Sequence, residues 1–336
     1  MNWLALDIGG ANLKVADGLG YAQSAPFAMW REPARLAHLI RTVISEAPPC
    51  DHLAVTITGE LADCFESKAA GVKFILQAVA AGSDNRHTRV YLSDGRLVSP
   101  QVAAQVPQLA AASNWHALAT FACRFTEKQS ATLIDVGSTT CDIIPLMGGI
   151  PAIRSTSDTK RLVAGELVYT GVERSPVCAV AGRVEYRGES CPLVQELFAT
   201  MCDVYLILGK LPEDPADIDT ADHKPATRAY ARQRLGRMVA ADREEFNHKD
   251  AVVLAQSVAD AQASRLATAI MEVQARQSSP EKIILSGHGE FLAVEALELA
   301  QITAPQFSLT KELGAAISRS APAHALAVLA REMTSQ

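Results

Sequence analysis

The segments DIGGANLK at residues 7–14 and DVGSTTCD at residues 135–142 decide the fold of this chain. Each segment lies between two apolar runs, and superposing them aligns Asp7 with Asp135 and Gly9 with Gly137. The flanking runs predict paired strands joined by a tight bend. Such a bend presents backbone amides to an anion and a carboxylate to the anion's cation. The doubled turn therefore indicates an anion-binding site built from two hairpins.

Two common phosphate-binding loops do not fit these turns. Neither turn matches G-x-G-x-x-G or G-x-x-x-x-G-K-[ST], which excludes the dinucleotide-binding and P-loop motifs at these positions. In those motifs the loop runs directly into a helix, whereas residues 13–16 and 143–146 have the pattern of returning strands. We therefore expect the phosphate to lie against hairpin turns.

Length and composition are those of a globular enzyme with two domains. The chain has 336 residues, of which 49% are hydrophobic and 20% charged, and single cores rarely grow to this size. The formal charge is −6 and the isoelectric point is near 5.8. Because there is no long basic run, the sequence does not predict a nucleic-acid partner.

The cysteines and the N-terminus predict a soluble, cytoplasmic protein. The seven cysteines contain no C-x-x-C pair, which favours reduced, buried thiols over disulfides or a zinc site. The first residues form a strand at once, and Asp7 stands where a signal peptide would stay apolar. No run of about twenty apolar residues offers a membrane span.

Strands and helices alternate along the chain, which predicts the α/β class. The predicted strands are 3–8, 13–16, 53–58, 90–92, both arms of the hairpin 131–146, and a strand in 282–291 that ends in a glycine turn. The predicted helices are 36–46, 71–80, most of 107–125, 192–210, 250–277 and 321–333. Residues 148–192 are expected to be largely irregular. The strand 53–58 ends in Gly59 and Glu60, a position at which α/β sheets hold ligand-binding residues.

Three strand-turn units, the last ending in Gly-His-Gly at 287–289, resemble the actin, sugar-kinase and heat-shock-chaperone ATPase superfamily in order and spacing. The resemblance covers nearly the whole chain. It implies a two-domain actin-like ATPase fold, which is RNase H-like, with a ligand cleft between the domains. The implied N-terminal domain comprises residues 1–128 plus 316–336, with a returning C-terminal helix, and the second domain comprises 129–315.

Longer strings carry a closer resemblance. They are TGELADCFESKAAGV (58–72), IDVGSTTCDIIPL (134–146), GELVYTGVERSPVCAV (165–180), the stretch 209–238 and LSGHGEF (285–291). Together they resemble the hydantoinase and oxoprolinase-related branch linked to tetrahydromethanopterin-dependent one-carbon transfer, which is similar to a synthase of methanofuran biosynthesis. The resemblance implies a transferase that joins a tyramine-type phenol to an aminomethylfuran-methyl diphosphate, forming an ether and releasing pyrophosphate. The cofactor made would be of the methanofuran or methylofuran type.

On this reading the two turns bind Mg²⁺ and the diphosphate, and ATP is not expected to be required. Asp7 and Asp135 hold the metal, because hard cations prefer carboxylate oxygens, although aspartate is also favoured in turns for its own hydrogen bonds. The residues expected around the diphosphate are Gly9, Gly10, Asn12, Lys14, Gly137, Ser138, Thr139, Thr140 and Arg174. Gly287, Gly289 and Glu290 are expected to face the furan or the phenol.

A phenol needs a general base, because its reference pKa of about 10 leaves it protonated at neutral pH. Glu60 is the first candidate, with Asp142 and Glu166 in reserve; Glu60 fits an acidic residue at a helix N-terminus equally well. Arg174 fits a surface ion pair as well as an anion ligand. The acidic segment 212–227 is either a lid over the site or a solvated loop. His288 and His116 are expected to be structural.

Two other classes of function stay open at this point. The first is an ATP-dependent enzyme, either a small-molecule kinase or a hydantoinase- or oxoprolinase-like hydrolase. The second is a nucleotide-gated binding or regulatory protein. The identity of the phenol is also open between tyramine, its glutamylated form and tyrosine, and the Ala-rich helix 250–277 offers a surface for a homo-oligomer.

Overall fold

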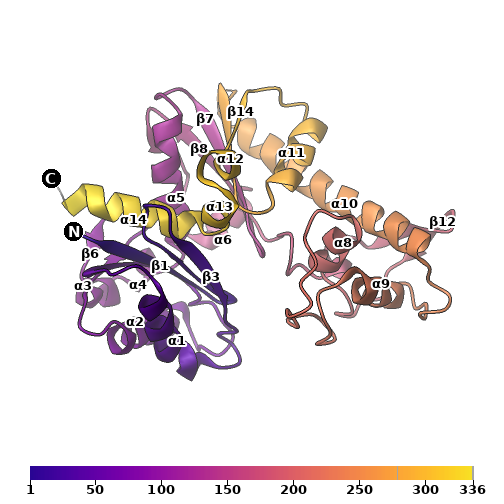
Figure 1. Cartoon of the computed structure of the whole chain (residues 1–336). Coiled ribbons are helices and arrows are strands. Elements are labelled where there is room, and N and C mark those ends of the chain that lie inside the picture. The colour runs from indigo at the N-terminus through magenta and orange to yellow at the C-terminus, as the bar shows by residue number, and fades with distance from the viewer. Residues whose placement is uncertain (278, 335–336) are drawn as a thin grey trace.

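Two mixed β-sheets flanked by helices form the framework of the protein (Figure 1). This computed structural model describes residues 1–277 and 279–334. The first sheet has the order β3 (Ala22–Pro26), β2 (Asn12–Ala16), β1 (Trp3–Gly9), β4 (His52–Thr58), β5 (His87–Tyr91) and β6 (Leu97–Val98). The second has the order β10 (Leu167–Val168), β8 (Cys141–Met147), β7 (Ala131–Val136), β13 (Lys282–Ser286) and β14 (Gln306–Ser308), and β9 (Ile150–Pro151) pairs with β8.

The two sheets repeat one arrangement. In each, the first strand pairs antiparallel with the strand that follows it, β1 with β2 and β7 with β8. On its other side the first strand pairs in parallel with a later strand, β4 or β13, which in turn pairs in parallel with β5 or β14. This duplication agrees with the predicted two-domain actin-like, RNase H-like fold. The apolar runs expected around both turns are the buried central strands of the sheets.

Helices cover the sheets and fill the space between them. In the first sheet's layer, α1 (Leu36–Glu46) packs on α2 (Lys68–Gly82). Between the sheets, α5 (Asn114–Ala122) and α14 (Ala321–Thr334) join two hydrophobic clusters, one shared with β7, β8 and β13 and the other with β1 and β4. The C-terminal helix therefore packs against the first sheet.

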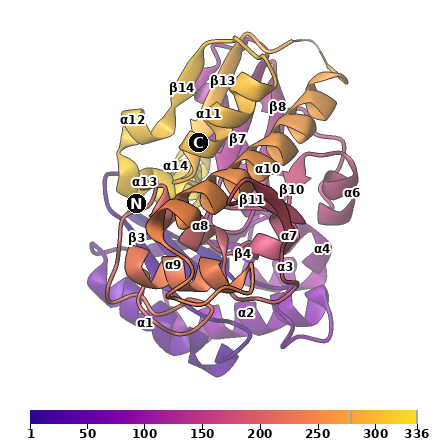
Figure 2. The ribbon, with the colours of Figure 1, turned by 90° about the vertical axis from the view of Figure 1, so that its right-hand side faces the viewer.

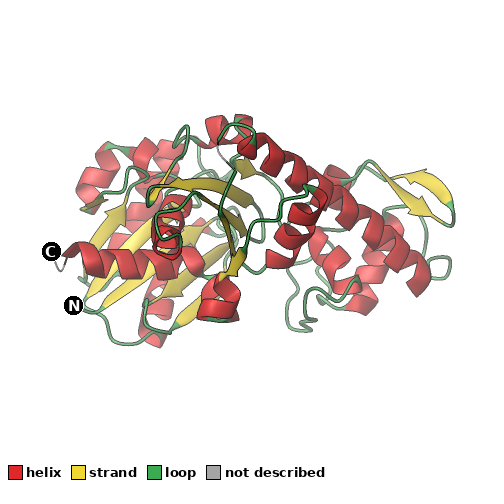
Figure 3. Ribbon diagram, turned by 90° about the horizontal axis from the view of Figure 1, so that it is seen from above, coloured by secondary structure: helices red, strands yellow, loops and turns green. Residues whose placement is uncertain are grey.

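The second sheet carries a helical extension. Helix α10 (His248–Gln274) packs against α8 (Met201–Ile207), α9 (Arg228–Arg237) and α11 (Glu290–Leu299), and it crosses in front of the second sheet in Figure 2. The hairpin of β11 (Arg183–Tyr186) and β12 (Glu189–Pro192) projects at the far end (Figure 3). The remaining short helices are α3 (Pro100–Gln105), α4 (Pro107–Ala110), α6 (Asp158–Val163), α7 (Val177–Val180), α12 (Leu309–Leu313), α13 (Ala315–Arg319), and the 3₁₀ turns Pro33–Arg35 and Cys123–Phe125.

Two predicted segments are wrong in detail. The predicted helix 192–210 is only α8, because Thr200 and Asp203 form a reciprocal capping box that begins the helix there, and Pro192 still belongs to strand β12. The stretch 148–192, expected to be irregular, contains α6, α7 and the short strands β9 to β12. These elements are too short for a periodicity to reveal them.

The cysteines and the helices bear on two further expectations. None of the seven cysteines is paired, but only Cys123 and Cys141 are buried, so the prediction of generally buried thiols is wrong. Cys64 is exposed. Among residues 1–277 and 279–334, no helix combines the length and apolar character that a bilayer crossing requires.

Candidate active site

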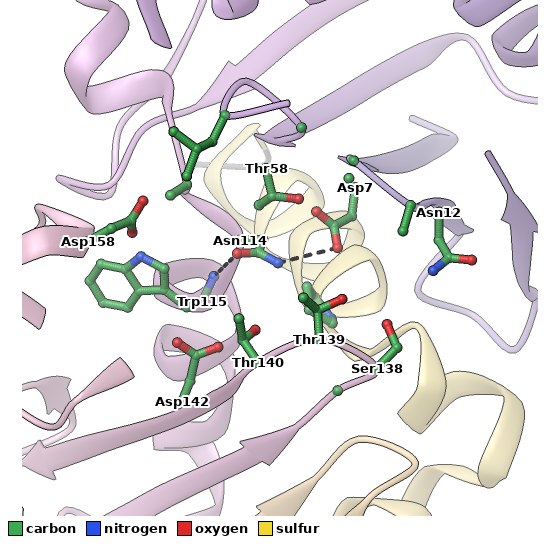
Figure 4. A pocket seen from close by; sticks show the side chains of 18 of the residues that line it. Asp7, Asn12, Thr58, Asn114, Trp115, Ser138, Thr139, Thr140, Asp142 and Asp158 are labelled. Atoms are coloured by element: carbon green, nitrogen blue, oxygen red, sulfur yellow. Dashed lines mark hydrogen bonds between the residues drawn. The ribbon is translucent and has the colours of Figure 1, made fainter. Parts of the chain in front are cut away.

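A cavity of about 310 Å³ lies between the two sheets and is lined by both duplicated turns. Most of the predicted site residues line it: Asp7, Gly9, Gly10, Asn12, Lys14, Glu60, Asp135, Gly137, Ser138, Thr139, Thr140, Asp142 and Arg174. Figure 4 shows Asp7 and Asn12 of the first turn near Ser138 and Thr139 of the second. Residues that lie far apart in the sequence thus share one pocket.

Asp7 is buried at the end of β1 and held by neutral donors. Thr56 Oγ1 donates to its Oδ1 at 3.2 Å, and Asn114 Nδ2 donates to its Oδ2 at 3.4 Å. Burial raises the pKa of Asp7, while the Lys14 ammonium and these donors oppose the rise. Lys14 lies directly opposite Asp7 in the β1–β2 register. The first turn therefore carries one carboxylate and one ammonium group toward the pocket.

The second turn carries two carboxylates in the corresponding positions. Asp135 and Asp142 are partners in the β7–β8 register. Burial, followed by the charge of Asp142, raises the pKa of Asp135 to about 6. The guanidinium of Arg161 donates to Asp142 Oδ1 at 2.7 Å, and Arg161 is fully buried. Because Asp142 is committed to this ion pair, it is a poor candidate for a general base.

Glu60 has the environment expected of a general base. It follows β4, is 2% exposed, and its Oε2 has no hydrogen-bond partner within the described part of the chain. Burial raises the pKa of Glu60 to about 7. A buried carboxyl group that titrates near neutral pH and faces a pocket is suited to accept a proton there.

Arg174 reaches the pocket from the loop that supports the second turn. The backbone amides of Val172, Glu173 and Arg174 donate to Gly137 and Ser138 carbonyls at 2.9 to 3.1 Å. The Arg174 guanidinium lies 4.5 Å from the Trp30 ring centroid and 3.8 Å from an Asp219 carboxylate oxygen. Arg174 is therefore a cation at the pocket wall, and its ion pair with Asp219 is a long one.

Four predicted site residues lie outside the pocket lining. Gly287 and Gly289 are packed against β7. An added Cβ on Gly287 would lie 2.2 Å from the Val136 carbonyl oxygen, and one on Gly289 would lie 2.3 Å from the Val136 side chain. Glu290 accepts hydrogen bonds from Ser308 and Thr310 and fastens α11 to α12. Glu166 is buried beside Arg154 and Arg161. Close packing explains the two glycines and hydrogen bonding explains Glu290, whereas Glu166 Oε2 has no hydrogen-bond partner within the described residues.

Several lining residues are not among the predicted site residues. They are Trp30, Thr58, Leu61, Asn114, Trp115, Asp158, Arg161 and Tyr169. Thr58 could have been predicted from the sequence, because it is the last residue of the strand that precedes Glu60. Asn114 precedes Trp115 in α5, and only the packing of that helix between the sheets brings it to Asp7.

The two histidines and the acidic segment have structural partners. His288 Nε2 lies 3.2 Å from Glu173, and His116 Nδ1 lies 3.0 Å from the Tyr91 hydroxyl group. Although burial opposes it, the contacts with His288 and Arg319 hold the pKa of Glu173 at about 2. In the acidic segment, Asp222 pairs with Arg234 and Arg237. No group of three or more metal-ligating side chains is found among the described residues.

The donor set nevertheless fits a magnesium ion that shares its coordination with a ligand. Asp7 and Asp135 are the carboxylates of the two turns, both line the pocket, and burial raises both pKa values. Mg²⁺ is commonly held by one or two carboxylates, several waters and the oxygens of a phosphate. Two carboxylates in the wall of a pocket that also contains Lys14 and the hydroxyl groups of residues 138–140 are compatible with such a site.

Comparison with known proteins decides the family. The family model described as hydantoinase/oxoprolinase matches residues 51–332. The chain belongs to the hydantoinase/oxoprolinase family. All the pocket residues from Thr58 onward lie within the matched region.

The chain is also similar to two archaeal proteins. It is 31% identical over 329 residues to the (4-{4-[2-(gamma-L-glutamylamino)ethyl]phenoxymethyl}furan-2-yl)methanamine synthase of Methanocaldococcus jannaschii, covering 97% of this chain and 96% of the relative. It is 25% identical over 205 residues to the synthase of the same name from Methanococcus vannielii, covering 60% of this chain and 90% of the relative.

Among solved structures, the chain is similar to the inorganic polyphosphate/ATP-glucomannokinase of Arthrobacter sp. strain KM. The TM-score is 0.46 at 15% sequence identity, covering 98% of this chain and 99% of the glucomannokinase.

Proposed function

We propose that the protein is a transferase of methanofuran- or methylofuran-type cofactor biosynthesis. It joins a tyramine-type phenol to an aminomethylfuran-methyl diphosphate and releases pyrophosphate, supplying tetrahydromethanopterin-linked one-carbon metabolism. The observation that carries the proposal is the 31% identity over 97% of the chain to the M. jannaschii synthase. The pocket adds chemical support, because it combines the ammonium and hydroxyl groups of the two turns with a buried carboxyl group, Glu60, whose Oε2 has no hydrogen-bond partner in the described chain.

The diphosphate is proposed to bind between the two turns. Ser138, Thr139 and Thr140 offer hydroxyl groups and Lys14 offers an ammonium group, all at the pocket wall. An added Cβ on Gly10 would meet no atom within 4 Å, so this part of the first turn is open. Donors held in place before the reaction stabilise the charge that develops on a departing group.

Asp7 and Asp135 would hold Mg²⁺ on this proposal. When bound, the ion supplies a positive charge that neutralises the departing pyrophosphate. ATP is not required, because the furan substrate already carries its leaving group. Asn114 donates to Asp7 Oδ2 at 3.4 Å and so restrains the orientation of that carboxylate.

Glu60 is proposed as the base. The bond between the furan methylene carbon and the diphosphate oxygen breaks with its electron pair, which leaves on pyrophosphate. The phenol oxygen forms the new bond to that carbon, and the phenol proton passes to Glu60 Oε2, the oxygen without a partner in the described chain. Atoms and charge balance as phenol plus diphosphate ester giving ether, pyrophosphate and one proton.

The test is pyrophosphate release with product mass, using purified protein, Mg²⁺, the furan diphosphate and either tyramine or its glutamylated form. A parallel reaction contains ATP in place of the furan diphosphate. The expected result is an ether product and stoichiometric pyrophosphate with no ATP consumed. ATP turnover with the furan diphosphate left intact would overturn the proposal and favour the ATP-dependent class of enzyme.

A further inference from the structure

The pocket has two chemically different ends, and only one of them is suited to phosphate. Figure 4 shows Asp158 and Trp115 at the opposite end from Asn12 and Ser138. Leu61 and Tyr169 also line the pocket, and these residues are 59% and 60% exposed. An acidic group among aromatic and aliphatic side chains repels a phosphate and attracts an aromatic cation.

Asp158 is the acidic group of this end, and its partner comes from the other sheet. It is the first residue of α6, and its Oδ2 accepts a hydrogen bond from Lys68 Nζ at 2.6 Å. Lys68 is the first residue of α2, which packs with the first sheet. The ion pair therefore joins the two sides of the pocket.

The ion pair is accessible enough to solvent for Asp158 to exchange Lys68 for another cation. The Asp158 side chain is 19% exposed and the Lys68 side chain is 40% exposed. An ion pair in contact with water contributes only about 0–1 kcal/mol, so a second ammonium group can replace Lys68 at little cost. A carboxylate also accepts more hydrogen bonds than the one that Lys68 donates.

Three polar atoms near this end lack hydrogen-bond partners within the described chain. They are Glu60 Oε2, Trp115 Nε1 and Arg161 Nε, and all three residues are buried and line the pocket. One face of the Trp115 ring is covered by Arg161, whose guanidinium carbon is 4.0 Å from the ring centroid. One acceptor and two donors left unsatisfied in a pocket wall indicate that a polar ligand completes them.

We propose that Asp158 receives an ammonium group carried by the phenolic acceptor, and that Lys68 is the resident cation which the acceptor displaces. This inference rests on the proposed function for the identity of the acceptor. Tyramine has a phenol at one end and an ammonium group at the other, which matches a pocket with Glu60 and Asp158 in its wall. Asp158 and Lys68 are thus specificity-determining residues that select an aromatic amine over a neutral phenol.

The experiment compares tyramine with 4-ethylphenol, which lacks only the ammonium group. In the wild-type protein, kcat/KM for tyramine is expected to exceed that for 4-ethylphenol by about tenfold or more, the value of a charge-assisted hydrogen bond. In Asp158→Asn the ratio is expected to fall to about one. In Lys68→Met the ratio is expected to rise, because the competitor for Asp158 is gone.

The ratio of kcat/KM is expected to fall in Asp158→Asn and to rise in Lys68→Met, and these opposite changes distinguish a binding site for the ammonium group from an ion pair with only a structural role. If the pair only held the two sides together, both variants would lose activity alike with both phenols, and that result would overturn the inference. Glu66→Gln and Lys73→Met are matched controls, because both residues are exposed and lie outside the pocket lining. They are expected to keep the wild-type ratio.

Equilibrium titration separates failure of this inference from failure of the proposed function. Calorimetry with tyramine and 4-ethylphenol is performed on the wild type and both variants without a furan substrate. Preferential binding of tyramine that is lost in Asp158→Asn supports the ammonium site even if no ether is formed. Equal binding of the two phenols, or no binding of either, overturns it.

Discussion

At the scale of single residues, the proposed role of Glu60 is the one that experiments can test most directly. Its pKa is raised to about 7 by burial, so the basic form accumulates as the pH rises through 7. We expect wild-type kcat/KM to increase through that pH and then level off. Glu60→Gln is expected to lower kcat/KM by about 10²–10⁴-fold, the usual contribution of a general base, and to remove this limb of the pH profile.

The same substitution has a separate effect on stability. The pKa of Glu60 rises from its ordinary value of 4.5 to about 7 on folding, so between these pH values the folded protein keeps a proton that the unfolded chain releases. The stabilisation that this proton gives the folded state is complete below pH 4.5 and is lost as the pH rises through 7. The loss amounts to roughly 3 kcal/mol. Thermal melts should therefore find Glu60→Gln more stable than wild type at pH 8 and equal to it at pH 4. A variant less stable at pH 8 would contradict the buried, unpaired environment.

The metal proposal is tested at two residues with matched substitutions. Asp7→Asn and Asp135→Asn are each expected to reduce turnover severely and to leave the fold intact, because each removes a charge that burial disfavours. Rates measured against Mg²⁺ concentration should show a raised half-saturation point. Near-wild-type turnover in both variants, with unchanged circular dichroism, would remove Asp7 and Asp135 from the metal site.

At the scale of elements, the second turn depends on the loop behind it. An added Cβ on Gly171 would lie 2.4 Å from the Ser138 carbonyl carbon and 2.5 Å from the Thr139 nitrogen. Gly171→Ala is therefore expected to displace this turn, weaken pyrophosphate binding and lower stability by about 1–3 kcal/mol. Gly182→Ala is the matched control, because its added Cβ meets no atom within 4 Å. Calorimetry and thermal melts on both variants check the prediction, and equal behaviour would contradict it.

The elements also explain how far the sequence could lead. The repeated acid-glycine turns predicted the central strands of both sheets, because a buried run ending in a tight turn is a local signal. Local signals could not place Asn114 or Asp158, since Asn114 reaches the pocket through the packing of its helix and Asp158 meets its partner Lys68 across 90 residues of sequence. They also could not separate pocket glycines from Gly287 and Gly289, whose small size is required by contact with β7.

At the scale of the whole molecule, duplication gives the pocket two walls, one from each sheet. The two turns come from different sheets. The domain bounds predicted from the sequence place the turns in different domains, and these bounds stay a prediction. The ion pair of Lys68 with Asp158 and the contact of Arg174 with Trp30 cross from one side to the other. Both contacts include partly exposed side chains, so they hold the walls only weakly.

An anion that binds both turns should therefore close the cleft. One diphosphate with Mg²⁺ can contact Asp7 and Lys14 on one wall and residues 137–140 on the other, so its binding energy favours the state in which the walls are close. We expect pyrophosphate with Mg²⁺ to reduce the radius of gyration in small-angle X-ray scattering and to slow amide exchange at residues 137–140. Chloride at equal ionic strength controls for screening, and EDTA should reverse the change. Slowed exchange with an unchanged scattering curve would mean that the turns bind pyrophosphate without movement of the walls.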